Sequence, residues 1–212
     1  MSLDDREVVL LIARVKADIP QPWPQWPGGW VGEIEAALLD AVLGIRANYG
    51  QDHNGVRGAI ARWRTHRHGS QAGLDDLRAL VSITPDALAQ VLQNKQKASD
   101  RQKVVLIQEA AQALLEAGMR RADDAIAHPS EAQVAYTSVR GLGDVTAAYF
   151  LMLLGQPGVK ADTWVQRFVT QAADRKVSAA EAEHLMIAAA ARLGVSATNL
   201  DYAVWSHVRR RR

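Results

Sequence analysis

Two short segments in the second half of the chain carry residues suited to chemistry on a nucleic acid. Gly141 and Gly143 flank a single leucine, so the backbone there can turn tightly and approach another chain closely. We predict a helix from about residue 144 to 154, and its first N–H groups would be unpaired and able to bind a phosphate. About twenty residues later, Asp162 starts another predicted helix. A phosphate-binding site combined with a single carboxylate is suited to chemistry on a nucleic-acid sugar.

The order of these features resembles the helix-hairpin-helix (HhH-GPD) DNA glycosylases, the superfamily of endonuclease III, adenine glycosylase and 3-methyladenine glycosylase. In that superfamily the hairpin has a Gly-apolar-Gly core followed by Thr-Ala, and the essential aspartate lies in a Val-Asp-Thr-x-Val-x-Arg segment. The matching residues here are Gly141-Leu142-Gly143, Thr146-Ala147 and Ala161-Asp162-Thr163-Trp164-Val165-Gln166-Arg167. The resemblance is sharp over residues 136–169 and looser over the rest of the chain from about residue 30.

The departures from the superfamily pattern indicate its monofunctional, cluster-free branch. Bifunctional relatives carry a lysine nucleophile two residues after the second hairpin glycine, where this chain has Val145, which cannot form a Schiff base. The chain has no cysteine, so thiolates cannot hold an iron–sulfur cluster. Trp164 stands where many relatives have histidine, which leaves the substrate unassigned. We expect no cofactor and no metal.

Asp162 is the candidate catalytic residue. Cleavage of an N-glycosidic bond develops positive charge on the sugar, and a carboxylate nearby can stabilise that charge and orient or deprotonate the attacking water. Asp162 could instead only cap its helix, as aspartates commonly do. The two roles are compatible, and the hairpin upstream favours catalysis.

The candidate DNA-binding residues are Gly141, Gly143, Asp144, Val145 and Thr146. We expect double-stranded DNA to bind through phosphate contacts that are independent of base sequence, with the target base flipped out. Because Asp144 is an acid where relatives often have a basic residue, this binding should be weak and salt-sensitive.

Two further groups of residues have alternative interpretations. One is a basic run that could follow a DNA path but could equally be a solvated face. The other is a set of tryptophans that could stack on bases but more simply pack inside one lobe. These residues are Lys95, Lys97, Arg101 and Lys103 in the run, and Trp23, Trp26 and Trp30 in the set.

A base pocket is less well defined by the sequence. Several relatives have a glutamine-rich turn where residues 43–49 read Leu-Gly-Ile-Arg-Ala-Asn-Tyr. Possible pocket residues are Arg46, Asn48 and Tyr49. Arg46 could contact a base or a phosphate, and a surface salt bridge is an equal alternative.

Composition predicts an intracellular soluble protein. The 212 residues are 48% hydrophobic, which allows one sizeable core or two small lobes. No apolar run approaches the roughly 18 residues of a membrane span, and the acidic start is unlike a signal peptide. We therefore expect no membrane partner and a cytoplasmic monomer, associated with the nucleoid if bacterial. The formal charge is only +2, so DNA binding must rest on local charge placement.

Hydrophobic periodicity predicts an all-α protein with no convincing strand. In relatives the middle helices form one lobe and the two chain ends form the other. That pattern predicts residues 1–49 and 136–212 as a composite lobe with the hairpin, and residues 50–135 as a central lobe. The predicted helices span residues 4–17, 31–49, 55–66, 74–80, 99–117, 123–127, 132–139, 143–154, 178–193 and 199–209, with others starting at Thr84 and Asp162.

Two functional hypotheses remain from the sequence. The first is a monofunctional DNA glycosylase that removes a damaged or modified base and leaves an abasic site, with Asp162 as the catalytic carboxylate. The second is a catalytically silent helix-hairpin-helix protein that binds DNA without cutting it. A weaker third alternative is a helical interaction module with no nucleic-acid role, which the near-neutral charge allows.

Overall fold

The computed structural model describes residues 3–47, 53–67, 73–98 and 100–210. This part of the chain is helical apart from loops and one short antiparallel hairpin, in which Lys97 pairs with Gln102 and Ala98 with Arg101. The all-α prediction is confirmed. The elements are α1 (Leu3–Asp18), α2 (Ile34–Leu43), α3 (Gly55–His66), α4 (Arg78–Val81), α5 (Pro85–Leu92), β1 (Lys97–Ala98), β2 (Arg101–Gln102), α6 (Lys103–Glu116), α7 (Ala122–Ala127), α8 (Pro129–Thr137), α9 (Asp144–Leu153), α10 (Thr163–Ala173), α11 (Ala179–Leu193) and α12 (Ala197–Arg210).

Several predicted helices have different bounds in the structure. The helix predicted over residues 31–49 spans only Ile34–Leu43, and the helix predicted over residues 74–80 begins at Arg78. The helix predicted over residues 99–117 begins only at Lys103, because the residues before it form the β1–β2 hairpin. The helix predicted over residues 132–139 begins at Pro129 instead. Proline is well suited to the first helical position, because the N–H that it lacks would have no intrahelical partner there.

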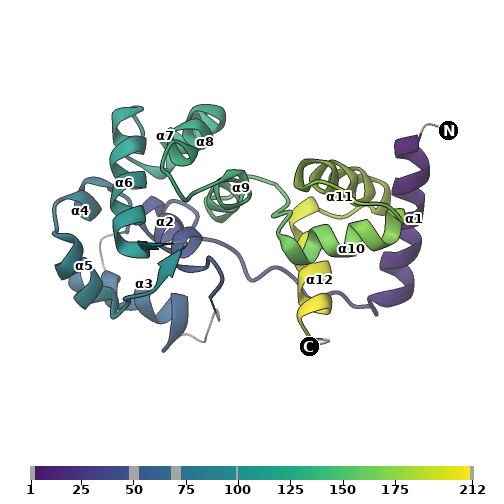
Figure 1. Cartoon of the computed structure of the whole chain (residues 1–212), viewed down its shortest axis with the longest axis horizontal. Coiled ribbons are helices and arrows are strands. Elements are labelled where there is room, and N and C mark those ends of the chain that lie inside the picture. Colours follow the sequence, from purple (N-terminus) through teal and green to yellow (C-terminus); the bar gives the residue numbers. More distant parts are fainter. Residues whose placement is uncertain (1–2, 48–52, 68–72, 99, 211–212) are drawn as a thin grey trace. The chain divides into compact units, whose positions relative to one another are not determined.

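The chain divides into two compact units (Figure 1). One unit comprises Met1–Gly28 and Pro157–Arg212, and the other comprises Gly29–Gln156. The predicted lobe boundaries at residues 49/50 and 135/136 placed α2, α9 and only the end of α8 with the chain ends. In the structure these three helices belong to the 29–156 unit. The hairpin between α8 and α9 therefore belongs to the 29–156 unit, and Asp162 belongs to the other.

The 29–156 unit is built around α2. Every residue of this helix is at most 1% exposed, and α2 packs against α3, α6 and α9. A helix that is buried on all sides lies at the centre of its unit, and α9 packs on it there. No described helix in either unit is long and apolar enough to cross a membrane.

Two acidic side chains are buried in α2, and both are paired. Glu35 accepts hydrogen bonds from the Trp63 indole (2.8 Å), the Arg67 guanidinium (3.1 and 3.3 Å) and the backbone N–H of Asp76 (2.9 Å). Asp40 accepts one from the Trp30 indole at 2.8 Å. A buried carboxylate is tolerated only when it is satisfied in this way, so these bonds fix the framework around α2.

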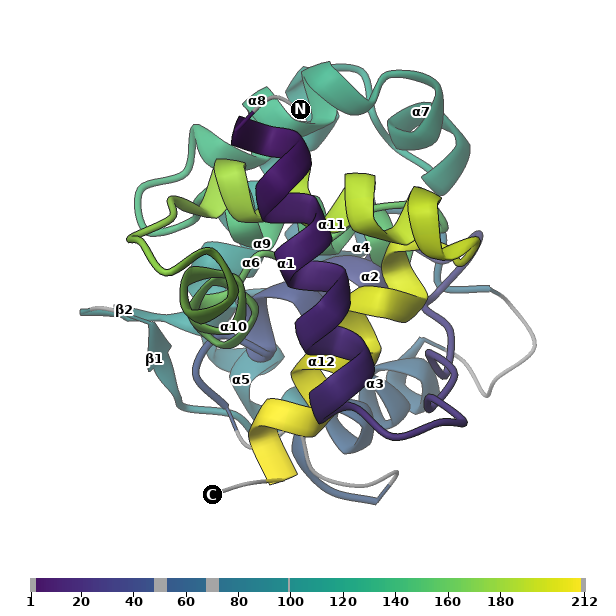
Figure 2. The ribbon, with the colours of Figure 1, turned by 90° about the vertical axis from the view of Figure 1, so that its right-hand side faces the viewer.

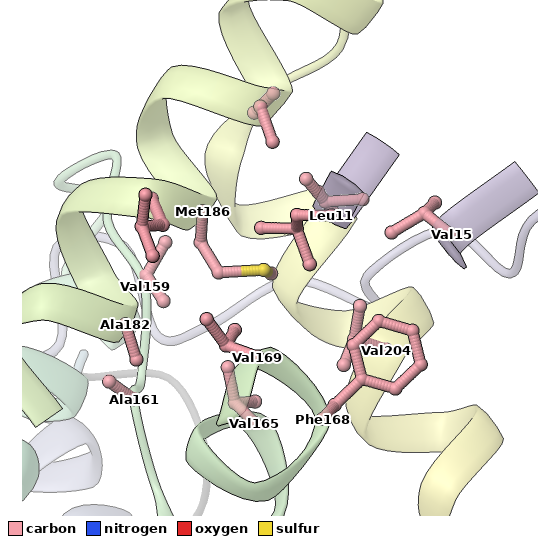
Figure 3. Packing of buried hydrophobic residues seen from close by; sticks show 14 of the residues in the cluster. Leu11, Val15, Val159, Ala161, Val165, Phe168, Val169, Ala182, Met186 and Val204 are labelled. Atoms are coloured by element: carbon pink, nitrogen blue, oxygen red, sulfur yellow. The ribbon is translucent and has the colours of Figure 1, made fainter. Parts of the chain in front are cut away.

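The other unit brings together the first helix and the last three. Helix α1 packs against α10 and α11, and α10 packs against α11 and α12 (Figures 1 and 2). Apolar side chains from all four helices fill one core, including Leu11 of α1, Val165 of α10, Met186 of α11 and Val204 of α12 (Figure 3). The segment before α10 adds Val159 and Ala161 to this core. The start of α10, where Asp162 lies, is therefore held on both sides by buried residues.

Candidate phosphate-binding hairpin and carboxylate site

The two glycines in the turn between α8 and α9 have different backbone conformations. Gly141 has φ +106°, a conformation that side chains with a Cβ rarely adopt. Gly143 precedes α9 in extended backbone (φ −142°, ψ 176°), and a Cβ placed there would meet nothing within 4 Å. The turn itself thus requires glycine only at Gly141. At Gly143 the absent side chain leaves open space beside the helix start.

The first N–H groups of α9 are the candidate phosphate donors. The first intrahelical bonds run from Thr146 N and Ala147 N to the Gly143 carbonyl, each at 3.0 Å. The N–H groups of Asp144 and Val145 precede those bonds and are left for an external acceptor. The Gly143 N–H already donates to Thr146 Oγ1 at 3.2 Å, and that hydroxyl donates back to the Gly143 carbonyl at 2.8 Å. Thr146 therefore acts mainly by holding the helix start in shape.

The charges beside the hairpin are mixed. Asp144 is exposed, and its Oδ1 accepts a hydrogen bond from Gln133 Nε2 at 3.2 Å. Arg101 reaches the hairpin from strand β2 and donates to the Arg140 carbonyl at 2.9 Å, while its guanidinium also pairs with Glu109. Of the predicted basic run, Arg101 is thus placed at the turn.

Lys103 does not belong to a solvated or DNA-facing surface. Its side chain is 1% exposed, and Nζ donates to the Leu43 carbonyl and to Gln96 Oε1, both at 2.8 Å. Burial lowers the pKa of its ammonium group to about 8. The interpretation of Lys103 as part of a basic path is wrong, because this lysine caps the end of α2 from inside the unit. Lys95 and Lys97 remain exposed.

The possible base-pocket residues are only partly described. Arg46 is exposed and has φ +49° in the turn after α2. An arginine in this left-handed region is uncommon, and such conformations gather at functional sites. Asn48 and Tyr49 lie outside the described residues. Of the three predicted tryptophans, Trp30 is anchored to buried Asp40, and Trp23 donates to the Ile19 carbonyl at 3.2 Å and packs on the core of its unit.

Asp162 is the N-cap of α10, as the sequence predicted. Its Oδ1 accepts hydrogen bonds from Trp164 N (2.8 Å) and Val165 N (3.2 Å). Among the described residues no donor reaches Oδ2, and the side chain is partly exposed. Behind it, Val165 and Val169 are fully buried (Figure 3). The cap fixes the carboxylate through one oxygen and leaves the other available, so capping and chemistry are compatible here.

Asp201 of α12 is a second carboxyl near Asp162 that sequence reasoning did not single out. It is 7% exposed, its Oδ1 has no hydrogen-bond partner among the described residues, and its carboxyl accepts a bond from the backbone N–H of Lys160. Burial first, and the negative charge of Asp162 second, raise the pKa of Asp201 well above its usual range. No sequence motif marks this residue, because a single aspartate on an amphipathic helix looks like a surface position.

Comparison with solved structures shows the same fold. The H. pylori 3-methyladenine DNA glycosylase (MagIII), bound to 1,N6-ethenoadenine, superposes with a TM-score of 0.65 at 14% identity, over 96% of this chain and 95% of that one. MBOgg1 in complex with a low-affinity DNA ligand superposes with a TM-score of 0.60 at 13% identity, over 84% of this chain. This chain spans only 61% of the length of MBOgg1. The predicted all-α, glycosylase-like fold is confirmed.

Comparison with protein sequences gives a family but no activity. No curated protein matches the chain. A family model matches residues 9–209, which is nearly the whole chain and includes both the hairpin and Asp162. The chain belongs to the family described as "Domain of unknown function (DUF8548)".

Proposed function

We propose that this protein is a monofunctional DNA glycosylase that hydrolyses the N-glycosidic bond of a damaged or modified base. In this reaction the C1′–N bond breaks with its electrons going to the base, and a water oxygen bonds to C1′. The water gives up a proton and the departing base takes one up. The sugar passes through an oxocarbenium-like state, which a nearby carboxylate stabilises.

The observation that supports this proposal is the hydrogen bonding of the Asp162 carboxylate in a glycosylase-like fold. The two N–H groups of α10 hold Oδ1 in a fixed position, and no described donor occupies Oδ2. A carboxylate held in this way is preorganised, so it needs little reorganisation when positive charge develops near it. The same free oxygen can accept a proton from the attacking water.

DNA binding through the hairpin completes the proposal. The N–H groups of Asp144 and Val145 at the start of α9 would hold one backbone phosphate, and Gly143 would allow that phosphate close approach. Arg101 contributes positive charge at the turn, and Asp144 opposes it. We therefore propose weak, salt-sensitive binding of double-stranded DNA by a monomer with the target base flipped out, in the cytoplasm or at a bacterial nucleoid.

The product should be an intact strand with an abasic site. Val145 occupies the position of the lysine that forms an imine with the sugar in bifunctional glycosylases, and valine has no amine. Borohydride should therefore trap no covalent protein–DNA adduct. A trapped adduct would show that another amine has taken the role of the missing lysine.

A panel of lesion duplexes tests the function directly. The names of the structural neighbours suggest 3-methyladenine and 1,N6-ethenoadenine as the first lesions, with 8-oxoguanine, uracil and an undamaged duplex alongside. We expect hot alkali to cleave one or more lesion strands after incubation with the protein, and no cleavage without alkali. If the protein binds these duplexes but excises nothing, the alternative of a catalytically silent helix-hairpin-helix DNA-binding protein replaces the glycosylase proposal.

A further inference from the structure

Asp201 is a buried acidic group that the proposed reaction does not yet use. It projects from α12, in the same unit as Asp162, and less than a tenth of it is exposed. Its carboxyl accepts a hydrogen bond from the Lys160 backbone, yet Oδ1 has no partner among the described residues. A buried polar oxygen without a partner is uncommon and requires an explanation.

Three charged side chains act on Asp201. Asp162 on the start of α10 and Glu183 on α11 are negative, and Lys160 on the segment before α10 is positive. Burial, together with the Asp162 charge, disfavours the ionised form of Asp201 more strongly than Lys160 favours it. A carboxyl that keeps its proton becomes a hydrogen-bond donor, which changes what its free Oδ1 can do.

Asp162 has the opposite environment. It is partly exposed, and two N–H groups at a helix N-terminus donate to its Oδ1, where a negative charge is favourable. The two carboxyls therefore differ in burial and in the hydrogen bonds that they accept, which is the kind of difference that gives two neighbouring carboxyls separate roles.

We infer that Asp162 and Asp201 form a carboxylate–carboxylic acid pair in which Asp201 holds the proton and serves as a positioning residue for Asp162. The functional part of this inference rests on the proposed glycosylase activity. A neutral Asp201 leaves Asp162 as the only charge of the pair and offers an O–H donor that can orient it or its water. An ionised Asp201 would add a second negative charge beside Asp162 and remove that donor.

Carbon-detected NMR of protein labelled in its aspartate carboxyls tests the pair without any substrate. The signal that disappears in Asp201→Asn identifies Asp201. We expect this carboxyl to titrate well above the ordinary aspartate range in the wild-type protein, and at lower pH in Asp162→Asn, where the neighbouring charge is gone. Asp174→Asn, at the far end of α10, is the matched control and should leave the Asp201 titration unchanged.

Thermal unfolding at several pH values gives a second, independent measurement. A raised pKa in the folded state means that the folded protein holds this proton more tightly than the unfolded chain does. As pH rises from about 4, the ordinary aspartate value, the wild-type protein should lose stability relative to Asp201→Asn until Asp201 ionises in the folded state. Parallel stability profiles for the two proteins, or an ordinary titration of Asp201 in the NMR experiment, would overturn the pair.

Activity measurements separate this inference from the proposed function. If a lesion is excised, the wild-type rate should fall at the pH where Asp201 loses its proton, and this fall should be absent in Asp201→Asn because an amide cannot ionise. The same alkaline fall in both proteins would overturn the positioning role. If no lesion is excised, the glycosylase proposal fails, while the NMR and unfolding measurements still decide whether the proton-sharing pair exists.

Discussion

Helices α9 and α10 both begin in extended backbone, yet their first N–H groups are used differently. In α10 the Asp162 carboxylate occupies the N–H groups of Trp164 and Val165, so this helix start supplies its own anion. In α9 the cap is Gly143, which has no side chain, and the N–H groups of Asp144 and Val145 are left for an external anion. One start is suited to hold a charge for chemistry, and the other to bind a charge from a ligand.

The two starts also differ in what fixes them. Asp162 sits on a helix whose inner face, Val165, Phe168 and Val169, is at most 3% exposed. The α9 start is held by the hydroxyl of Thr146 and by the left-handed turn at Gly141. The first arrangement resists displacement of the carboxylate because its supports are buried. The second leaves the surface at Gly143 open, as a ligand requires.

The largest expected effect comes from removing the charge at the α10 start. Asp162→Asn should keep the cap, since asparagine caps helices about as well as aspartate, and should keep DNA binding. It should reduce base excision about a hundredfold or more, because the loss of one well-placed electrostatic group costs roughly 3 kcal/mol in barrier. Single-turnover excision and helix content by circular dichroism, measured together, check this.

Asp162→Ala is the matched variant for the cap. It should lose the same activity and, in addition, about 1 kcal/mol of stability, because the Trp164 and Val165 N–H groups lose their acceptor. Full excision by the asparagine variant would eliminate Asp162 as the catalytic carboxylate.

The sequence predicted those features that depend on a few neighbouring residues. The glycine at position 141 was predicted to form a turn, because a positive φ excludes most other side chains. Asp162 was predicted to start a helix, because the first N–H groups of a helix favour a side chain that accepts hydrogen bonds. Lys103 was misread, since its neighbours Lys95, Lys97 and Arg101 made it look like part of a solvated run. Its burial depends on the end of α2, sixty residues earlier in the chain.

The unit boundaries and Asp201 were missed for the same physical reason. The grouping of α9 with the middle helices follows from its packing on the buried α2, which no local pattern shows. Asp201 gains its character from Lys160 and Asp162, about forty residues before it. Long-range packing decides which unit α9 belongs to and how Asp201 is surrounded. The hydrophobic periodicity of a single segment carries no information about such packing.

The second largest expected effect is on stability, and it distinguishes the two hairpin glycines. Gly141→Ser should destabilise the protein by about 2 kcal/mol, because a side chain must then adopt φ +106°. Gly143→Ser should be neutral or slightly stabilising, since the backbone is already extended, the space is open and serine is a good N-cap. Urea unfolding of the two variants checks this. Equal losses at both positions would mean that the turn depends on Gly143 as well.

The smallest of these effects concerns the open helix start at Gly143. Gly143→Asp should keep the fold, because aspartate is a favourable N-cap and would meet no atom there, yet its carboxylate would occupy the N–H groups and repel a phosphate. Affinity for a duplex at low salt should fall about tenfold, ~1.4 kcal/mol. The slope of log affinity against log salt concentration should decrease by about one, as expected for the loss of one phosphate contact.

Gly143→Asn is the control that sharpens this test, because it has the same shape and capping ability without the charge, and it should lose clearly less affinity. If both variants bind the duplex as tightly as the wild-type protein does, then the start of α9 is not the phosphate-binding site. The hairpin would then be a structural turn only, and the contrast between the two helix starts would rest on Asp162 alone.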